Sequence, residues 1–102
     1  MSDFKYYNSL SKFELGKIFQ TKGIYEARKK NDEFDKEVIH SLTRYCLADF
    51  KDMVQEDAEL NKSAIANGND RIFGAYNTCL GKIYIITEYD RSCTTVLFAD
   101  EY

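Results

Sequence analysis

The chain has 102 residues, of which 44% are hydrophobic and 30% charged, and its formal net charge is −3. This composition excludes a disordered chain and supplies one modest core, so we expect a single domain over residues 1–102, with 1–14 as an N-terminal extension. No run approaches the ~18 to 20 apolar residues of a membrane span, and the first residues lack the basic start and apolar block of a secretion signal. The composition therefore predicts a cytoplasmic protein without membrane contact.

The first predicted elements are a strand and a helix. The stretch "GKIFQTKGI", residues 16–24, places Ile18 in a short apolar run that ends at Gly23, which is typical of a strand closed by a turn. Further along, Phe34, Val38, Leu42 and Tyr45 follow one another at helical spacing, and Ile39 and Cys46 widen the same stripe. This pattern predicts an amphipathic helix over 34–48, with acidic residues at its start that suit the helix dipole.

A second helix and three strands complete the predicted fold. Val54, Ala58, Asn61 and Ile65 share one helical face, and Gly68 follows as a left-handed stop, which predicts a helix over 54–66. The stretches "RIFGAYNT", "GKIYIITEY" and "TTVLFAD" are then rich in residues that favour strands, and short turns separate them. We therefore predict an α+β fold, a small antiparallel sheet of about four strands covered on one face by two amphipathic helices.

Three cysteines and one histidine give little evidence for a metal or redox site. The cysteines are widely spaced, which indicates reduced thiols with structural roles rather than a disulfide framework or a zinc site. His40 has no second histidine with which to share a metal. We expect no metal, no cofactor and no catalytic residue. The cysteines are Cys46, Cys79 and Cys93.

A charged turn near the end of the chain is either a contact site or a structural corner. Its acidic, basic and hydroxyl side chains could bind an anion or a polar ligand, but no nucleophile has a base within reach. Alternatively, Asp90 caps the turn backbone and Arg91 pairs with Glu88 or with an acid on the helices, which is the interpretation we favour. The candidate residues are Glu88, Asp90, Arg91, Ser92 and Thr94.

An acidic segment is the other candidate site. Its carboxylates could face a basic partner, or they could be an ordinary solvated helix face. They lack the glycine and the spacing of a calcium loop. A basic stretch over 16–30 also leaves direct binding of nucleic acid open, although it is not favoured. The acidic candidates are Asp49, Asp52, Glu56, Asp57 and Glu59.

The order of these motifs resembles a family of small uncharacterised proteins from plasmids, conjugative elements and phages of bacteria. The stretches are "LGKIFQTKGI", "DFKDMVQEDAELNKSAI", "DRIFGAY" and "GKIYIITEYDRSCTTVLFADEY", and they cover roughly residues 15–102. The family's pattern ends close to "ITEADRSxTTxLxPxxY". This chain departs from it at Phe50 and Lys51, which replace tryptophan and glycine, and at Ala99, which replaces proline. The matching positions are Asp49, Asp52, Glu56, Asp57, Asn61, Tyr76, Thr87, Glu88, Asp90, Arg91, Ser92, Thr94, Thr95 and Tyr102.

The resemblance implies a protein carried by a mobile element in a bacterial host, and it implies no named reaction. Small non-enzymatic proteins of this kind often disarm host defence, and some inhibit CRISPR nucleases by occupying basic nucleic-acid channels. The leading expectation is therefore an anti-CRISPR inhibitor that binds a host nuclease or its guide complex. The alternatives are a regulator of plasmid maintenance, a small nucleic-acid-binding protein and a small enzyme with an unrecognised site. The sequence leaves the oligomeric state open.

Overall fold

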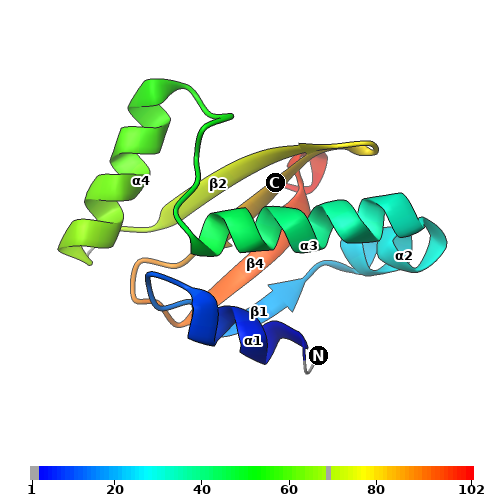
Figure 1. The fold of residues 1–102 in the computed structure, drawn as a ribbon, viewed down its shortest axis with the longest axis horizontal. Coiled ribbons are helices and arrows are strands. Elements are labelled where there is room, and N and C mark those ends of the chain that lie inside the picture. The colour runs from blue at the N-terminus through cyan, green and yellow to red at the C-terminus, as the bar shows by residue number, and fades with distance from the viewer. Residues whose placement is uncertain (1–2, 69) are drawn as a thin grey trace.

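The computed structural model describes residues 3–68 and 70–102, which form helices around one face of a small sheet (Figure 1). This confirms the predicted α+β class. The helices are α1 (Asp3–Leu10), α2 (Lys22–Lys30), α3 (Asp32–Cys46) and α4 (Gln55–Asn67). The strands are β1 (Lys17–Gln20), β2 (Ile72–Thr78), β3 (Gly81–Thr87) and β4 (Cys93–Phe98), and a 3-10 turn, η1 (Ala99–Glu101), follows them.

The sheet is mixed rather than fully antiparallel. Its strand order is β1-β4-β3-β2, and the β2–β3 and β3–β4 pairs are antiparallel, as the short turns between these strands predicted. The prediction was wrong for β1, which runs parallel to β4 with Ile18 opposite Thr94. A parallel pair needs a long connection between its strands, and here three helices and two strands lie between β1 and β4.

Two helices lie where the sequence analysis had predicted none. The predicted strand over 16–24 ends at Gln20, because Thr21 caps a new helix by accepting a hydrogen bond from the backbone N–H of Ile24 (3.2 Å). Within the N-terminal extension, α1 packs against α3 and buries Tyr7 in the main core. The segment that follows α1 is held to the end of α3, where Lys12 N donates to the Cys46 carbonyl at 2.9 Å.

The core lies between α3 and the sheet. The predicted apolar stripe of α3 is confirmed, since Phe34, Val38, Leu42, Tyr45 and Cys46 have no exposed surface. Ile39 was wrongly included, because it lies at the margin of the stripe and is 40% exposed. The helix begins two residues earlier than predicted, where the side chain of Asn31 accepts a hydrogen bond from a backbone N–H of the first turn.

The helix α4 packs against β2, at the edge of the sheet (Figure 1). Ala64 is buried, whereas Val54, which we had placed on the packed face, precedes the first residue of the helix, makes no side-chain capping hydrogen bond and is 67% exposed. Gly68 ends the helix in the left-handed conformation, as predicted (φ 68°). One flank of α4 consequently stays free of the core.

A chain of buried hydroxyl groups ties the elements together. The Tyr45 hydroxyl lies 2.7 Å from the Thr87 hydroxyl, which lies 2.7 Å from the Thr94 hydroxyl, and the Ile72 carbonyl lies 3.2 Å from the Tyr45 hydroxyl. Thr94 donates to the carbonyl of Leu15, just before β1 (2.7 Å). Each bond satisfies a polar group that would otherwise be buried without a partner, so this network fixes α3, the sheet and the entry to β1 relative to one another.

Candidate functional site

The charged turn between β3 and β4 is built as a structural corner. Arg91 adopts a left-handed conformation (φ 61°), and its guanidinium donates to the carbonyls of Asp70 (2.6 Å), Ala64 (2.8 Å) and Glu88 (3.2 Å). The predicted pairing with the Glu88 carboxylate was therefore wrong, because backbone carbonyls at the end of α4 and in the turn occupy the guanidinium. Through these bonds to Ala64 and Asp70, Arg91 holds the end of α4 and the residue before β2 against the β3–β4 turn.

The other residues of the turn also serve the backbone. Asp90 accepts a hydrogen bond from the Ser92 N–H (3.0 Å), which confirms the predicted cap. Hydrogen bonds from the side chain and then the backbone of Ser92 lower the pKa of the Asp90 carboxyl. Thr94 is buried in the hydroxyl network. Gly16 has a positive φ of 65° and lies directly against the carbonyls of Arg91 and Ser92. Arg91 and Thr94 are therefore committed to structural contacts, whereas Asp90 and Ser92 remain exposed and the Glu88 carboxylate makes no bond among the described residues.

The acidic segment divides into two parts. The guanidinium of Arg44 binds the carboxylates of both Asp49 (2.9 Å) and Asp52 (2.7 Å) and lies over the ring of Tyr76 (5.1 Å to its centroid). The hydrogen bond from Arg44 lowers the pKa of Asp49, and the two carboxylates raise the pKa of Arg44. Asp49 and Asp52 therefore hold the α3–α4 connection, so two of the five predicted acids are bound within the chain, and the single charge of Arg44 offsets one of their two negative charges.

The remaining three acids lie on the exposed surface of α4. Glu56, Asp57 and Glu59 are exposed, and no ion pair within the described parts of the chain involves them. Glu59 accepts one hydrogen bond, from the side-chain amide of Gln55 (3.3 Å). We call these three residues the α4 acids. They are the part of the predicted acidic site that remains free to meet a partner.

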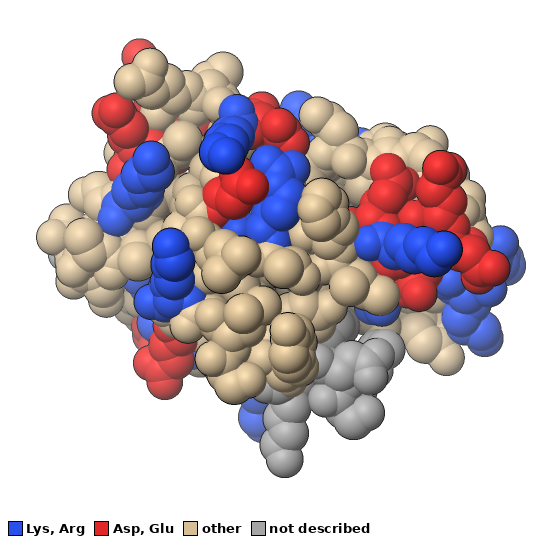
Figure 2. All heavy atoms as spheres, in the orientation of Figure 1, with Lys and Arg blue, Asp and Glu red and all other residues tan. Residues whose placement is uncertain are grey.

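A second acidic surface lies at the start of α3. Figure 2 shows acidic side chains gathered there around a lysine, and the first turn of α3 carries Asp32, Glu33 and Asp35. Asp35 is bound to Arg28 (2.6 Å). From the sequence, these acids were predicted only to interact with the helix dipole, a role that their position in the first turn allows.

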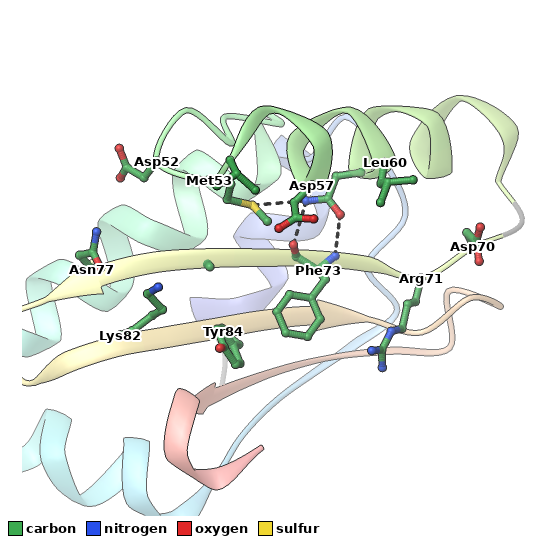
Figure 3. Close-up of a pocket in the computed structure, with 13 residues that line it drawn as sticks. Asp52, Met53, Asp57, Leu60, Asp70, Arg71, Phe73, Asn77, Lys82 and Tyr84 are labelled. Atoms are coloured by element: carbon green, nitrogen blue, oxygen red, sulfur yellow. Dashed lines mark hydrogen bonds between the residues drawn. The ribbon is translucent and has the colours of Figure 1, made fainter.

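A groove of about 540 Å³ runs between α4 and the sheet, within the usual size of ligand-binding pockets (Figure 3). Its walls combine apolar and charged side chains, and Val54 and Leu60 are 67% and 68% exposed. The aromatic rings of Phe73 and Tyr84 lie 4.6 Å apart on the sheet side. The lining residues are Asp52, Met53, Val54, Asp57, Leu60, Asn61, Asp70, Arg71, Phe73, Ala75, Asn77, Lys82 and Tyr84.

Tyr102 closes one end of the aromatic wall. Its ring packs edge-on against Phe73 (5.4 Å) and Tyr84 (5.8 Å), and its hydroxyl accepts a hydrogen bond from Arg71 (2.6 Å). Edge-on ring pairs of this kind add about 0.5 to 1.5 kcal/mol each beyond their buried area. Tyr102 does not itself line the groove, but it packs against three residues that do, Phe73, Tyr84 and Arg71.

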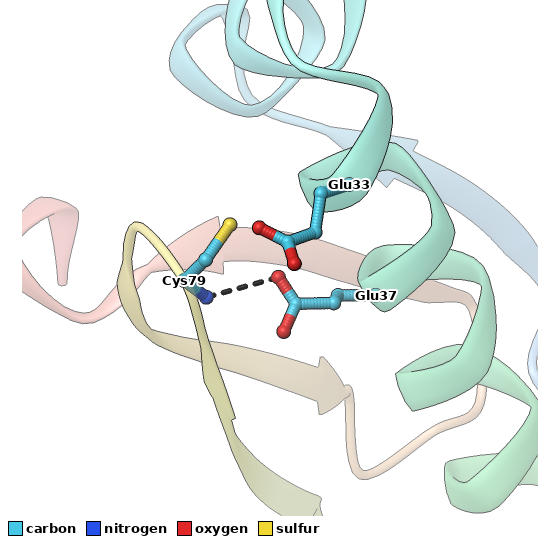
Figure 4. Close-up of side chains that lie close together, drawn as sticks. All are labelled: Glu33, Glu37 and Cys79. Atoms are coloured by element: carbon cyan, nitrogen blue, oxygen red, sulfur yellow. Dashed lines mark hydrogen bonds between the residues drawn. The ribbon is translucent and has the colours of Figure 1, made fainter.

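A third cluster joins the start of α3 to the tip of the β2–β3 hairpin (Figure 4). The ligand-type atoms of Glu33, Glu37 and Cys79 lie within 4.8 Å of one another, and the Cys79 N–H donates to the Glu37 carboxylate (2.9 Å). A hydrogen bond between the Cys79 side chain and Glu37, together with the negative charge of that carboxylate, raises the pKa of the Cys79 thiol to about 11. Cys79 is a free, exposed cysteine, and the neighbouring carboxylates make its thiol a poor nucleophile.

Comparison with known proteins adds no relative to these observations. No family model, no curated protein and no solved structure matches the chain. Over 3–68 and 70–102, the helices are too short or too polar to cross a membrane.

Two features of the candidate site escaped the sequence analysis. The groove has aromatic residues from β2 and β3, Phe73 and Tyr84, and their meeting depends on strand pairing rather than on local pattern. Asn61 is buried and hydrogen-bonds to the backbone of Phe73 (2.8 and 2.9 Å), and this role had a visible signal, because a polar side chain interrupted an otherwise apolar helical face. A buried polar residue in such a stripe indicates a specific hydrogen-bonding partner.

Proposed function

We propose that the chain is a mobile-element protein that binds and inhibits a host defence system, with a CRISPR effector nuclease or its guide complex as the leading target. One observation supports this most strongly: α4 places three exposed acids without ion-pair partners in the described residues beside a groove with exposed apolar side chains. Clustered charge beside apolar surface is typical of a surface that binds another macromolecule.

The α4 acids suit a basic partner. A nuclease that holds nucleic acid does so with lysine and arginine side chains, and an acidic surface of a small protein competes for the same charges. Complementary charge accelerates the encounter, while the apolar side chains beside it contribute area that is removed from water. The proposed inhibitor therefore acts by occupying a channel, and no reaction is required of it.

Direct binding of nucleic acid is the second candidate, with plasmid maintenance as its setting. It has the support of three exposed lysines on α2, Lys22, Lys29 and Lys30. Arg28 does not add to this surface, because Asp35 and Gln20 bind its guanidinium at 2.6 and 2.9 Å. Three lysines on one short helix make a weak footprint beside the α4 acids and the groove, so a protein partner is favoured.

The proposal predicts which host protein is retained and by which surface. The test variant carries Glu56→Gln, Asp57→Asn and Glu59→Gln, and the control variant carries Glu14→Gln, Glu33→Gln and Asp100→Asn at other exposed acids. Both sets remove three negative charges, so only position differs between them. Affinity capture from a host lysate, with identification by mass spectrometry, is expected to recover a CRISPR nuclease or its guide complex with the parent and the control, and about tenfold less with the test variant.

The identity of the retained protein decides between the candidates. A replication or partition protein would overturn the anti-defence proposal in favour of plasmid maintenance. If the test variant recovered as much of the nuclease as the parent does, the nuclease would remain the target, but the α4 acids would not be part of the interface. Circular dichroism of the variants keeps loss of binding separate from unfolding, because surface substitutions usually change stability by about 0.5 kcal/mol or less.

A further inference from the structure

The free edge of β2 forms part of the groove. β2 is a terminal strand of the sheet, so one side of its backbone has no neighbouring strand. At Phe73 the side-chain amide of Asn61 fills that side: it accepts from the Phe73 N–H (2.9 Å) and donates to the Phe73 carbonyl (2.8 Å), as Figure 3 shows. Asn61 thus makes the same two bonds to the edge that a residue of a neighbouring strand would make.

The next two outward positions of β2 have no such cap. In an antiparallel pair, residues alternate between facing the partner strand and facing away from it. Phe73 faces away from β3, so Ala75 and Asn77 present their backbone N–H and C=O groups to the same open side. No hydrogen bond to these four backbone groups occurs among the described residues. Both residues line the groove, opposite Asp52, Met53 and Val54.

We infer that the groove binds an extended segment of the partner protein, which adds to the sheet as a short strand along Ala75–Asn77 and carries a lysine or arginine toward Asp57. The identity of the partner rests on the proposed function, whereas the open edge of β2 and its hydrogen-bonding groups follow from the geometry alone. Strand addition uses main-chain hydrogen bonds for affinity and side-chain pockets for specificity.

The side chains around the edge define the segment's composition. Asp57 lies in the groove without an ion-pair partner in the described residues, so a basic side chain complements it there, whereas Lys82, opposite Asn77 on the neighbouring strand, favours a polar residue at that end of the segment. Val54 and Leu60 are exposed at the helical wall and favour an apolar neighbour on the same segment. Because side chains alternate along a strand, a segment that alternates basic or polar with apolar residues satisfies both.

The test uses a displayed library of random decapeptides, selected on the intact chain at low salt, with the most enriched peptide synthesised. We expect enriched sequences to alternate apolar or β-branched residues with lysine or arginine. In amide hydrogen exchange followed by NMR, the peptide is expected to slow exchange at Ala75 and Asn77 at least tenfold. The Phe73 amide, which Asn61 already protects, is expected to change little.

A proline substitution provides a matched variant. Ala75→Pro removes an outward N–H and places a ring on the open side, while the bonds between β2 and β3 stay intact, so the fold is expected to persist. The variant is expected to bind the peptide at least tenfold more weakly. Lys62→Ala, on the exposed surface of α4 outside this groove, is the control and is expected to bind as the parent does.

Several outcomes would overturn the inference. A peptide that binds tightly without protecting Ala75 and Asn77 would place the site elsewhere, and enrichment of acidic peptides would contradict the chemistry of the groove. Protection of both amides in the free chain at high concentration, with the mass of a dimer, would make a second copy the occupant. If capture yields no defence protein while the peptide still protects the edge, the proposed function fails and the strand-binding site stands.

Discussion

Replacing Gly16 by alanine is expected to lower the free energy of unfolding by about 3 to 5 kcal/mol, the largest effect that the structure predicts for a single methyl group. Two costs combine. Gly16 has a φ of 65°, where a side chain is strained, and a Cβ there would meet the backbone carbonyls of Arg91 and Ser92 at a separation that no real Cβ adopts. Backbone atoms cannot move aside as a flexible side chain can, so the entry to β1 must separate from the turn.

Gly68→Ala is the matched control for this prediction. Gly68 has nearly the same φ, 68°, but a Cβ there meets no atom within 4 Å. It therefore carries only the conformational cost of the left-handed region, about 1 to 2 kcal/mol. Chemical denaturation of both variants measures the difference. Equal destabilisation of the two would show that the contact between Gly16 and the turn is absent in solution.

Arg91→Ala is expected to destabilise the fold by about 2 to 3 kcal/mol, because it leaves the carbonyls of Ala64 and Asp70 without their charged donor. For a domain of this size, that corresponds to a fall in Tm of roughly 10 to 20 °C. Arg91→Lys restores the charge but not the planar fork that reaches several carbonyls, so it should recover only part of the loss. Thermal unfolding followed by circular dichroism provides the measurement.

Glu88→Ala tests whether Arg91 acts through backbone carbonyls, as the structure shows, or through an ion pair with the Glu88 carboxylate, as the sequence suggested. The Glu88 carboxylate has no hydrogen bond or ion pair among the described residues, and only its carbonyl serves Arg91. We expect this variant to unfold within about 0.5 kcal/mol of the parent. A loss of stability as large as that of Arg91→Ala would show that the Glu88 carboxylate does pair with Arg91. If Arg91→Ala left the melting temperature unchanged but abolished partner binding, the β3–β4 turn would be a contact site rather than a structural element.

The sequence predicted the parts of the fold that depend on local periodicity. The stripe from Phe34 to Tyr45 identified α3, and Gly68 identified the end of α4, because helical spacing and a left-handed stop are visible within a few residues. The β2–β3 hairpin was likewise set by strand-forming residues around a short turn. In these segments the local preference and the packed structure agree.

The features that were missed depend on contacts far apart in the sequence. Nothing near Ile18 indicates that β1 will lie parallel to β4, since the partner is more than seventy residues away. The helix α2 begins inside a stretch with strand-like residues, because the Thr21 cap outweighs a short apolar run. The acidic site was predicted only in part. The density of negative charge was visible in the sequence, but the ion pairs of Asp49 and Asp52 with Arg44 were not.

The central claim, that the α4 acids meet a basic surface of a host protein, is tested most directly by the salt dependence of association. Association rates of the captured partner are measured from low to high ionic strength for the parent, the variant of Glu56, Asp57 and Glu59, and the charge-matched control. We predict that the α4 variant associates about tenfold more slowly at low salt and responds less steeply to salt, while the control follows the parent. An α4 variant with the parent's rate and the parent's slope would contradict the claim and leave these acids as a solvated helix face.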